Sequence, residues 1–221
     1  MSLKLAVLIS GRGSNLEALI HACNGADFPA EIAVVIANKP DAAGLETAAK
    51  AGLETLVVDH KGFDDREGFE QALQEGLTTH KPGLVVLAGF MRLLSADFVR
   101  AWKDRMINIH PSLLPAYKGL HTHERALEDG VRFSGCTIHY VRAEMDNGPI
   151  IAQAAVPVHP NDSAADLAAR VLQEEHRLLP HAVRLIAQGK VRVSGNRVAF
   201  DSLDWPEKAL LSPVPPVTEN A

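Results

Sequence analysis

The chain has 221 residues, of which 47% are hydrophobic, so it can bury a sizeable core within one globular unit. Its formal net charge of -5 comes from acidic and basic residues mixed along the chain, which excludes the basic stripe that nucleic-acid binding requires. No apolar run approaches the roughly 20 residues that cross a bilayer, and the N-terminus lacks the pattern of a secretory leader. Because the chain has only two cysteines, Cys23 and Cys136, we expect a reduced, cytoplasmic protein.

The first hundred residues alternate strand patterns with helix patterns. Continuous apolar runs are typical of strands buried on both faces, and they occur at residues 5–9, 32–37, 55–58 and 84–88. Segments with one apolar face predict helices at residues 16–23, 42–51 and 66–80. This alternation favours right-handed crossovers and a parallel sheet covered by helices.

The pattern changes after Gly89. We expect a helix at 95–102, a strand ending at His110, a loop at 115–119, strands at 136–141 and 150–158, a long helix from Ser163 to Gln188, and a small hairpin at 191–200. The predicted fold class is α/β: a Rossmann-like twisted sheet with a parallel N-terminal half covered by helices on both faces. Its C-terminal half has antiparallel strands and one long helix. Residues 201–221 form a Pro-rich tail.

A glycine-rich turn at residues 10–15, Ser-Gly-Arg-Gly-Ser-Asn, follows the first predicted strand. It would present backbone N–H groups and a helix N-terminus to a phosphate, with Ser14 and Asn15 as further donors. It is no dinucleotide fingerprint, because Leu16 replaces the third glycine and Asn38 replaces the acidic residue after the second strand. A phosphorylated ligand is the functional interpretation, and a plain turn made by two glycines is the structural one.

Residues 106–110 alternate apolar with polar side chains, which places Asn108 and His110 on one face of a strand. Pro111 has no N–H to continue a ladder, so we expect the strand to end immediately after His110. Ligands bind at the carboxyl ends of parallel strands. The pair is therefore either a ligand site or a pair of hydrogen-bonded core residues.

Ten histidines raise the question of a metal site. The candidate ligands are His121, His123, His139 and Cys136. Their spacing matches neither H-E-x-x-H nor a paired Cys-x-x-Cys motif, so no metal is expected.

Five short blocks then occur along the chain. They are Ser10-Gly11-Arg12-Gly13-Ser14-Asn15, Ala88-Gly89-Phe90-Met91-Arg92, Asn108-Ile109-His110-Pro111-Ser112-Leu113-Leu114-Pro115, Gly119-Leu120-His121-Thr122-His123 and Met145-Asp146-Asn147-Gly148-Pro149-Ile150. Together, over about residues 3–200, they resemble the phosphoribosylglycinamide formyltransferase family. The resemblance implies transfer of the formyl group of 10-formyltetrahydrofolate, a co-substrate, to the amine of 5'-phosphoribosylglycinamide in de novo purine biosynthesis. We expect residues 1–200 to form one such domain, with a phosphate-binding half at about 1–100 and a catalytic, folate-binding half at about 101–200.

The resemblance also implies roles for particular residues. Asn108, His110 and Asp146 match the family's catalytic trio, and their chemistry agrees with this. An amide and a protonated imidazole can stabilise negative charge on the formyl oxygen, and a carboxylate can orient the imidazole.

The binding positions are carried over in the same way. The substrate-binding residues are Gly13, Ser14, Asn15 and Glu175, and the folate-binding residues are Arg66, Met91, Arg92, Leu93, Leu94, Asn108, Arg142, Ala143, Glu144, Met145 and Asp146. By local pattern alone, residues 91–94 are either core with one solvated Arg or the wall of a flat heteroaromatic pocket. Two positions depart from the family. Ala143 stands where relatives often have a carboxylate, and Leu172 stands where a polar substrate contact is common.

Three alternatives remain at this point. A formyltetrahydrofolate hydrolase would share the trio, but it usually carries an additional N-terminal domain. A methionyl-tRNA formyltransferase needs a basic C-terminal RNA-binding domain, whereas an acidic, Pro-rich stretch follows Phe200. A non-catalytic nucleotide-binding protein would explain the glycine turn alone. The expected partners are the two small-molecule substrates, without nucleic acid or membrane, and a homodimer is compatible with the sequence.

Overall fold

The predicted strands and helices are present in the computed structural model, which describes residues 2–212. The strands are β1 (Leu3–Ile9), β2 (Ala30–Ala37), β3 (Thr55–Val57), β4 (Leu84–Leu87), β5 (Met106–His110), β6 (Phe133–Tyr140), β7 (Ile150–Pro157), β8 (Val191–Ser194) and β9 (Arg197–Phe200). The helices are α1 (Ser14–Cys23), α2 (Ala43–Lys50), α3 (Arg66–His80), α4 (Ala96–Ala101), α5 (Thr122–Glu128) and α6 (Ala164–Ala187), with one 3-10 turn, η1 (His60–Gly62). The observed bounds differ from the predicted ones by at most a few residues.

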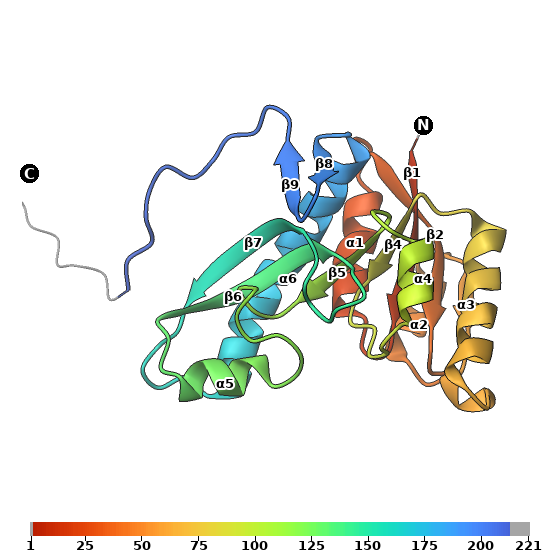
Figure 1. Cartoon of the computed structure of the whole chain (residues 1–221), viewed down its shortest axis with the longest axis horizontal. Helices are drawn as coiled ribbons and strands as arrows, with labels where there is room; N and C mark the ends of the chain where they lie inside the picture. Colours follow the sequence, from red (N-terminus) through yellow and green to blue (C-terminus); the bar gives the residue numbers. More distant parts are fainter. Residues whose placement is uncertain (1, 213–221) are drawn as a thin grey trace, which may run out of the picture.

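The main sheet has seven strands in the order β3-β2-β1-β4-β5-β6-β7 (Figure 1). Strands β1 to β5 pair in parallel, whereas β5 with β6 and β6 with β7 pair antiparallel. The predicted fold class is therefore confirmed. Because β1, β4 and β5 run in the same direction, their carboxyl ends meet at one edge of the sheet, where ligands bind in open α/β sheets.

Alternate side chains of β1 enter two separate cores. Leu5, Val7 and Ile9 pack with α1 and α6 on one face of the sheet. Ala6 and Leu8 pack with α3 and α4 on the other face. All five side chains are fully buried, which explains why this strand is an unbroken apolar run in the sequence.

Helix α6 begins at the predicted cap. Ser163 Oγ accepts a hydrogen bond from Asp166 N, and Asp166 Oδ2 accepts one from Ser163 N, at 3.2 and 2.9 Å. The buried stripe of the helix includes Leu167 and Val171, as expected. Glu175 lies on the same stripe and is only 7% exposed, so α6 carries a carboxylate into the interior.

Helix α5 was not predicted from the sequence. It has seven residues, and its N-cap residue, His121, has a left-handed backbone with φ of 56° and makes no capping hydrogen bond through its side chain. The usual start signals of a helix are therefore missing from the sequence.

The Pro-rich tail falls partly outside the described residues. Residues 201–212 contain no helix or strand, and the ring of Trp205 packs edge-on against Phe200 with ring centroids 5.3 Å apart. The prediction for residues 213–221 lies outside the part of the chain that the structure describes. Between residues 2 and 212, no helix combines the length and the apolar character that a bilayer crossing demands.

Candidate active site

Asn108 and His110 lie at the carboxyl end of β5, where the sheet changes from parallel to antiparallel pairing. Ile107 and Ile109 are buried in the core with α1 and α6, so Asn108 and His110 face the opposite side of the sheet, as predicted. His110 is only 5% exposed. The strand ends at His110, before Pro111, as expected.

Asp146 reaches His110 from the turn between β6 and β7. Its Oδ2 lies 3.5 Å from His110 Nδ1, and its side chain is largely buried. A Cβ at Gly148 would overlap the carbonyl oxygen of Tyr140 in β6, so only glycine allows the turn to pack this closely against the strand. The structure thus brings the predicted trio together in space, although Asp146 is distant from the other two residues in the sequence.

His139 is a fourth polar residue of this group, and the sequence suggested it only as a metal ligand. It lies opposite Asn108 in the pairing of β5 with β6 and is 2% exposed. Burial lowers the pKa of His139, so the ring is neutral at neutral pH. Its Nδ1 donates to Tyr140 O at 3.0 Å, which leaves Nε2 to accept from Asn108 Nδ2 at 3.2 Å. This bond fixes the orientation of the Asn108 amide.

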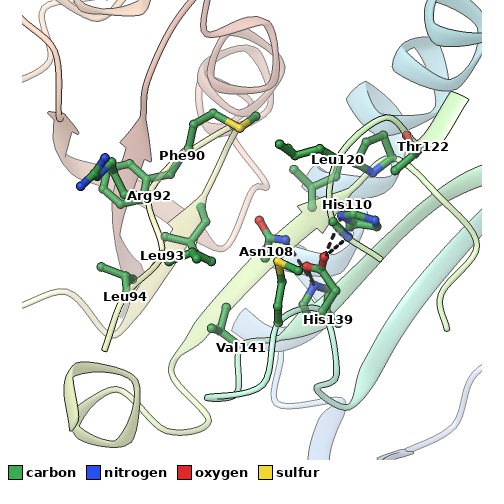
Figure 2. A pocket seen from close by; sticks show the side chains of 18 of the residues that line it. Phe90, Arg92, Leu93, Leu94, Asn108, His110, Leu120, Thr122, His139 and Val141 are labelled. Atoms are coloured by element: carbon green, nitrogen blue, oxygen red, sulfur yellow. Dashed lines mark hydrogen bonds and ion pairs between the residues drawn. The ribbon is translucent and has the colours of Figure 1, made fainter. Parts of the chain in front are cut away.

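A cavity of about 780 Å³ opens beside this group (Figure 2). Its size falls within the range of small-molecule sites. One wall is formed by residues 89–94, and the other walls are formed by residues 119–124, by His139, and by residues 141–143 and 145–146. Met91 and Leu120 are 67% and 71% exposed, so large apolar side chains at the border of the cavity are open to solvent. Such a lining suits a flat, largely apolar ligand held by a few polar contacts.

The glycine-rich turn connects β1 to α1. Gly13 is the N-cap of α1 with φ of 76°, and a Cβ there would lie 2.8 Å from Gly44 Cα. Behind the turn, Asn15 Nδ2 donates to Glu175 Oε2 at 2.8 Å, whereas the buried Asn15 Oδ1 has no hydrogen-bond partner among residues 2–212. Burial raises the pKa of Glu175, although the bond from Asn15 opposes this effect. An unpaired buried acceptor beside a carboxylate is suited to a ligand with hydroxyl or amine donors.

A hydrogen-bonded chain connects the glycine-rich turn to the cavity. Ser10 Oγ donates to Asn38 Oδ1 at 2.5 Å and accepts from Met91 N at 2.7 Å. Three loops that follow β1, β2 and β4 are therefore joined behind the cavity wall, so the turn and the wall are held in a defined relative position.

A family model described as formyl transferase matches residues 3–183 of this chain. The chain belongs to the formyl transferase family. The phosphoribosylglycinamide formyltransferase of Escherichia coli (strain K12) is 44% identical over 204 residues, which cover 92% of this chain and 96% of that protein. The trifunctional purine biosynthetic protein adenosine-3 of Homo sapiens is 47% identical over 193 residues, which cover 87% of this chain and 19% of that protein. The chain thus spans between 14% and 19% of the length of the trifunctional relatives that it matches.

Solved structures of formyl transferases agree with this assignment. Glycinamide ribonucleotide transformylase 1 from Symbiobacterium toebii superposes with a TM-score of 0.88 at 46% identity, covering 90% of this chain and 94% of that chain. The phosphoribosylglycinamide formyltransferase from Coxiella burnetii, in complex with CHES, gives a TM-score of 0.87 at 43% identity, covering 91% of this chain and 94% of that chain. The predicted resemblance to this family is therefore confirmed.

The structure brings most, but not all, of the predicted folate-binding residues of this formyl transferase to the cavity. The predicted residues that line it are Met91, Arg92, Leu93, Leu94, Asn108, Arg142, Ala143, Met145 and Asp146. Arg66, the first residue of α3, and the exposed Glu144 are not among the lining residues. The histidine and cysteine candidates do not form a metal centre, because within residues 2–212 no three His, Cys, Asp or Glu side chains are grouped as metal ligands.

Proposed function

We propose that this formyl transferase moves the formyl group of 10-formyltetrahydrofolate to the amine of 5'-phosphoribosylglycinamide. The observation that carries the proposal is the group of Asn108, His110 and Asp146 beside a cavity of suitable size and lining. The E. coli relative with nearly full coverage is a phosphoribosylglycinamide formyltransferase, which supports the choice of acceptor. The roles of the catalytic and binding residues, the single domain over residues 1–200, a cytoplasmic location and a homodimer stay predictions.

In the proposed reaction, the acceptor amine attacks the formyl carbon, and negative charge develops on the formyl oxygen. Asn108 would stabilise this charge through the amide N–H that is not bonded to His139. The orientation of that amide is set before the reaction, because neutral His139 can only accept at Nε2. Preorganised donors of this kind are among the largest contributions to catalysis.

His110 would move the proton. A new bond forms between the acceptor nitrogen and the formyl carbon, the bond from that carbon to folate nitrogen 10 breaks, and one proton passes from the amine to nitrogen 10. An imidazole can accept the proton from the amine and deliver a proton to nitrogen 10, so the ring is unchanged after the reaction. Asp146, 3.5 Å from Nδ1, would orient the ring and stabilise its charged form.

On the substrate side, we assign the phosphate to the N-terminus of α1, with Gly13, Ser14 and Asn15. Helix N-termini bind phosphate through free N–H groups and the helix dipole. Glu175 would contact the ribose and glycinamide portion, and the unpaired Oδ1 of Asn15 would accept from the same ligand. The contact between Asn15 and Glu175 supports this assignment, because it joins two predicted substrate residues from α1 and α6.

On the folate side, the apolar lining of the cavity supports binding of the ring system. The ring would lie between residues 91–94 on one side and residues 141–143 and 145–146 on the other, with backbone groups supplying polar contacts at Ala143. Arg66 and Glu144 stay assigned to this co-substrate as more distant contacts, since they do not line the cavity.

An absorbance assay for loss of the folate formyl group tests the proposal. We expect turnover with 5'-phosphoribosylglycinamide present and only background without it. Equal turnover without the acceptor would indicate a hydrolase. Absence of turnover under both conditions would reject this pair of substrates.

A further inference from the structure

The His110 ring contacts the protein through both of its nitrogens. Nε2 lies 2.9 Å from the backbone oxygen of Tyr117, and Nδ1 lies 3.5 Å from Asp146 Oδ2. A carbonyl oxygen only accepts hydrogen bonds, so Nε2 carries a hydrogen. Nε2 keeps this hydrogen in the neutral and in the protonated ring. The proton that enters and leaves during the reaction is therefore the one on Nδ1, the nitrogen that faces Asp146.

The Tyr117 carbonyl is held in place by the side chain of the same residue. The phenol donates to Asp129 Oδ2 at 2.9 Å, and the guanidinium of Arg125 lies 5.4 Å from the centre of the ring. Arg125 also donates to Lys118 O at 2.7 Å. Partial burial, followed by the bond to Asp129, raises the pKa of the Tyr117 phenol, so the phenol remains a donor at neutral pH. Helix α5 and the residue that follows it thus anchor this loop.

The backbone of Tyr117 needs such an anchor. Its φ is 53°, in the left-handed region that residues with a side chain seldom occupy. This conformation persists where surrounding contacts enforce it. Two residues later, Gly119 N donates to Asp146 Oδ2 at 2.9 Å. One short loop therefore contacts the imidazole at Nε2 and the carboxylate that faces Nδ1, and so it determines the spacing of the pair.

We propose that Tyr117 is a positioning residue whose side chain, held by Asp129 and Arg125, places the backbone carbonyl that selects the Nε2–H tautomer of His110. The proposal rests on the proposed function only in assigning proton transfer to His110. With the carbonyl in place, Nδ1 is a base when the ring is neutral and an acid when it is charged. Without it, the neutral ring also populates the Nδ1–H tautomer, which cannot accept a proton at the productive position.

Nitrogen-15 NMR of histidine-labelled protein tests the proposal directly. In the unmodified protein we expect His110 to show a protonated Nε2 and an unprotonated Nδ1 when neutral. Tyr117→Phe removes only the hydroxyl group and keeps the ring volume, and Asp129→Leu removes the acceptor. Both should shift the His110 signals toward a mixture of tautomers. Asp129→Asn keeps an acceptor oxygen and should retain the original signals, as should the adjacent exposed control Glu128→Gln.

Kinetics supply the second readout. Loss of this exposed hydrogen bond, taken at the ordinary strength of a protein hydrogen bond, should lower kcat of Tyr117→Phe and Asp129→Leu by about two- to tenfold, while the folate KM stays within about twofold. Unchanged His110 signals in both variants would overturn the proposal, whether or not kcat falls. The spectra are recorded without substrates, so they decide this proposal even if the unmodified protein fails to formylate 5'-phosphoribosylglycinamide, a failure that would reject the proposed function alone.

Discussion

His110 is the residue on which the proposed chemistry depends most directly. Replacing it with Ala removes the group that would carry the proton and removes the imidazole that lies 3.5 Å from Asp146. Because general acid–base catalysis contributes roughly 10²–10⁴-fold, we expect turnover to fall by at least about a hundredfold. Steady-state kinetics with both substrates measure this.

This experiment needs a control variant and a check that the protein folds. His21→Ala changes an exposed histidine on α1 and should keep normal turnover. The circular dichroism spectrum of His110→Ala should match that of the unmodified protein, because His110 is the last residue of β5 and borders the cavity rather than either hydrophobic core. Near-normal turnover of a folded His110→Ala protein would exclude His110 from the mechanism.

His139 predicts a pH dependence of stability. Burial lowers its pKa in the folded protein, whereas the unfolded imidazole titrates at about 6.5. Below pH of about 6.5 the unfolded state therefore binds more protons, and the free energy of unfolding falls as the pH drops toward the folded-state pKa. Urea unfolding at several pH values should show a shallower fall for His139→Gln than for the unmodified protein. An equally steep fall would mean that His139 is not buried in the neutral form.

The sequence could identify Asn108 and His110 but not the role of His139. Alternation along β5 and Pro111 after it are local features, readable in a single stretch. His139 meets Asn108 because β6 pairs with β5 in one register. That register depends on packing of the whole sheet, so the local sequence does not predict which residues face each other.

At the scale of elements, different residues of the glycine-rich turn serve the fold and the proposed phosphate binding. Gly13 is required by the fold, because its φ is positive and a Cβ would crowd Gly44 Cα. Any larger residue there would push α1 away from α2 and would affect folding as well as binding. The free N-terminus of α1 and the Ser14 hydroxyl are the parts available to a phosphate.

Ser14→Ala is therefore the sharper test of the phosphate assignment. A lost hydrogen bond to a charged phosphate is worth about 1.5–3 kcal/mol, so we expect KM for 5'-phosphoribosylglycinamide to rise by about tenfold or more. The folate KM should not change, because Ser14 does not line the large cavity. Glu17→Gln, exposed on the first turn of the same helix, serves as the control. Equal increases of both KM values would contradict the assignment.

The elements differ in how well the sequence predicts them, for physical reasons. Helix α3 is capped by Asp65, has an apolar face and ends before a Pro-Gly pair, so its observed bounds equal the predicted ones. Helix α5 is short and begins after a left-handed His121, so its stability comes from packing of Ala126 against β6, β7 and α6. Tertiary contacts, rather than local pattern, determine such a helix.

At the scale of the whole molecule, the two cores on opposite faces of the sheet share the same strands. Leu19 of α1 lies in the core with α6, and Leu73 of α3 lies in the core on the other face; both are fully buried. Because alternate residues of β1 enter both cores, loosening one core should weaken the strand that supports the other. We therefore expect the residues of the sheet to unfold as one cooperative unit.

Leu19→Ala and Leu73→Ala test this coupling. Each creates a cavity and should lower the free energy of unfolding by about 2–5 kcal/mol. Urea unfolding of each variant should show one transition, with circular dichroism and the fluorescence of Trp102 giving the same midpoint. Trp102 lies in the core with α3 and α4, and all proteins carry Trp205→Phe so that the exposed second tryptophan does not contribute to the signal. Leu211→Ala, at an exposed position, is the control and should leave the midpoint unchanged.

If Leu19→Ala lowered the circular dichroism midpoint while the Trp102 midpoint stayed in place, the two faces would unfold independently. The prediction of a single domain over residues 1–200 would then be wrong.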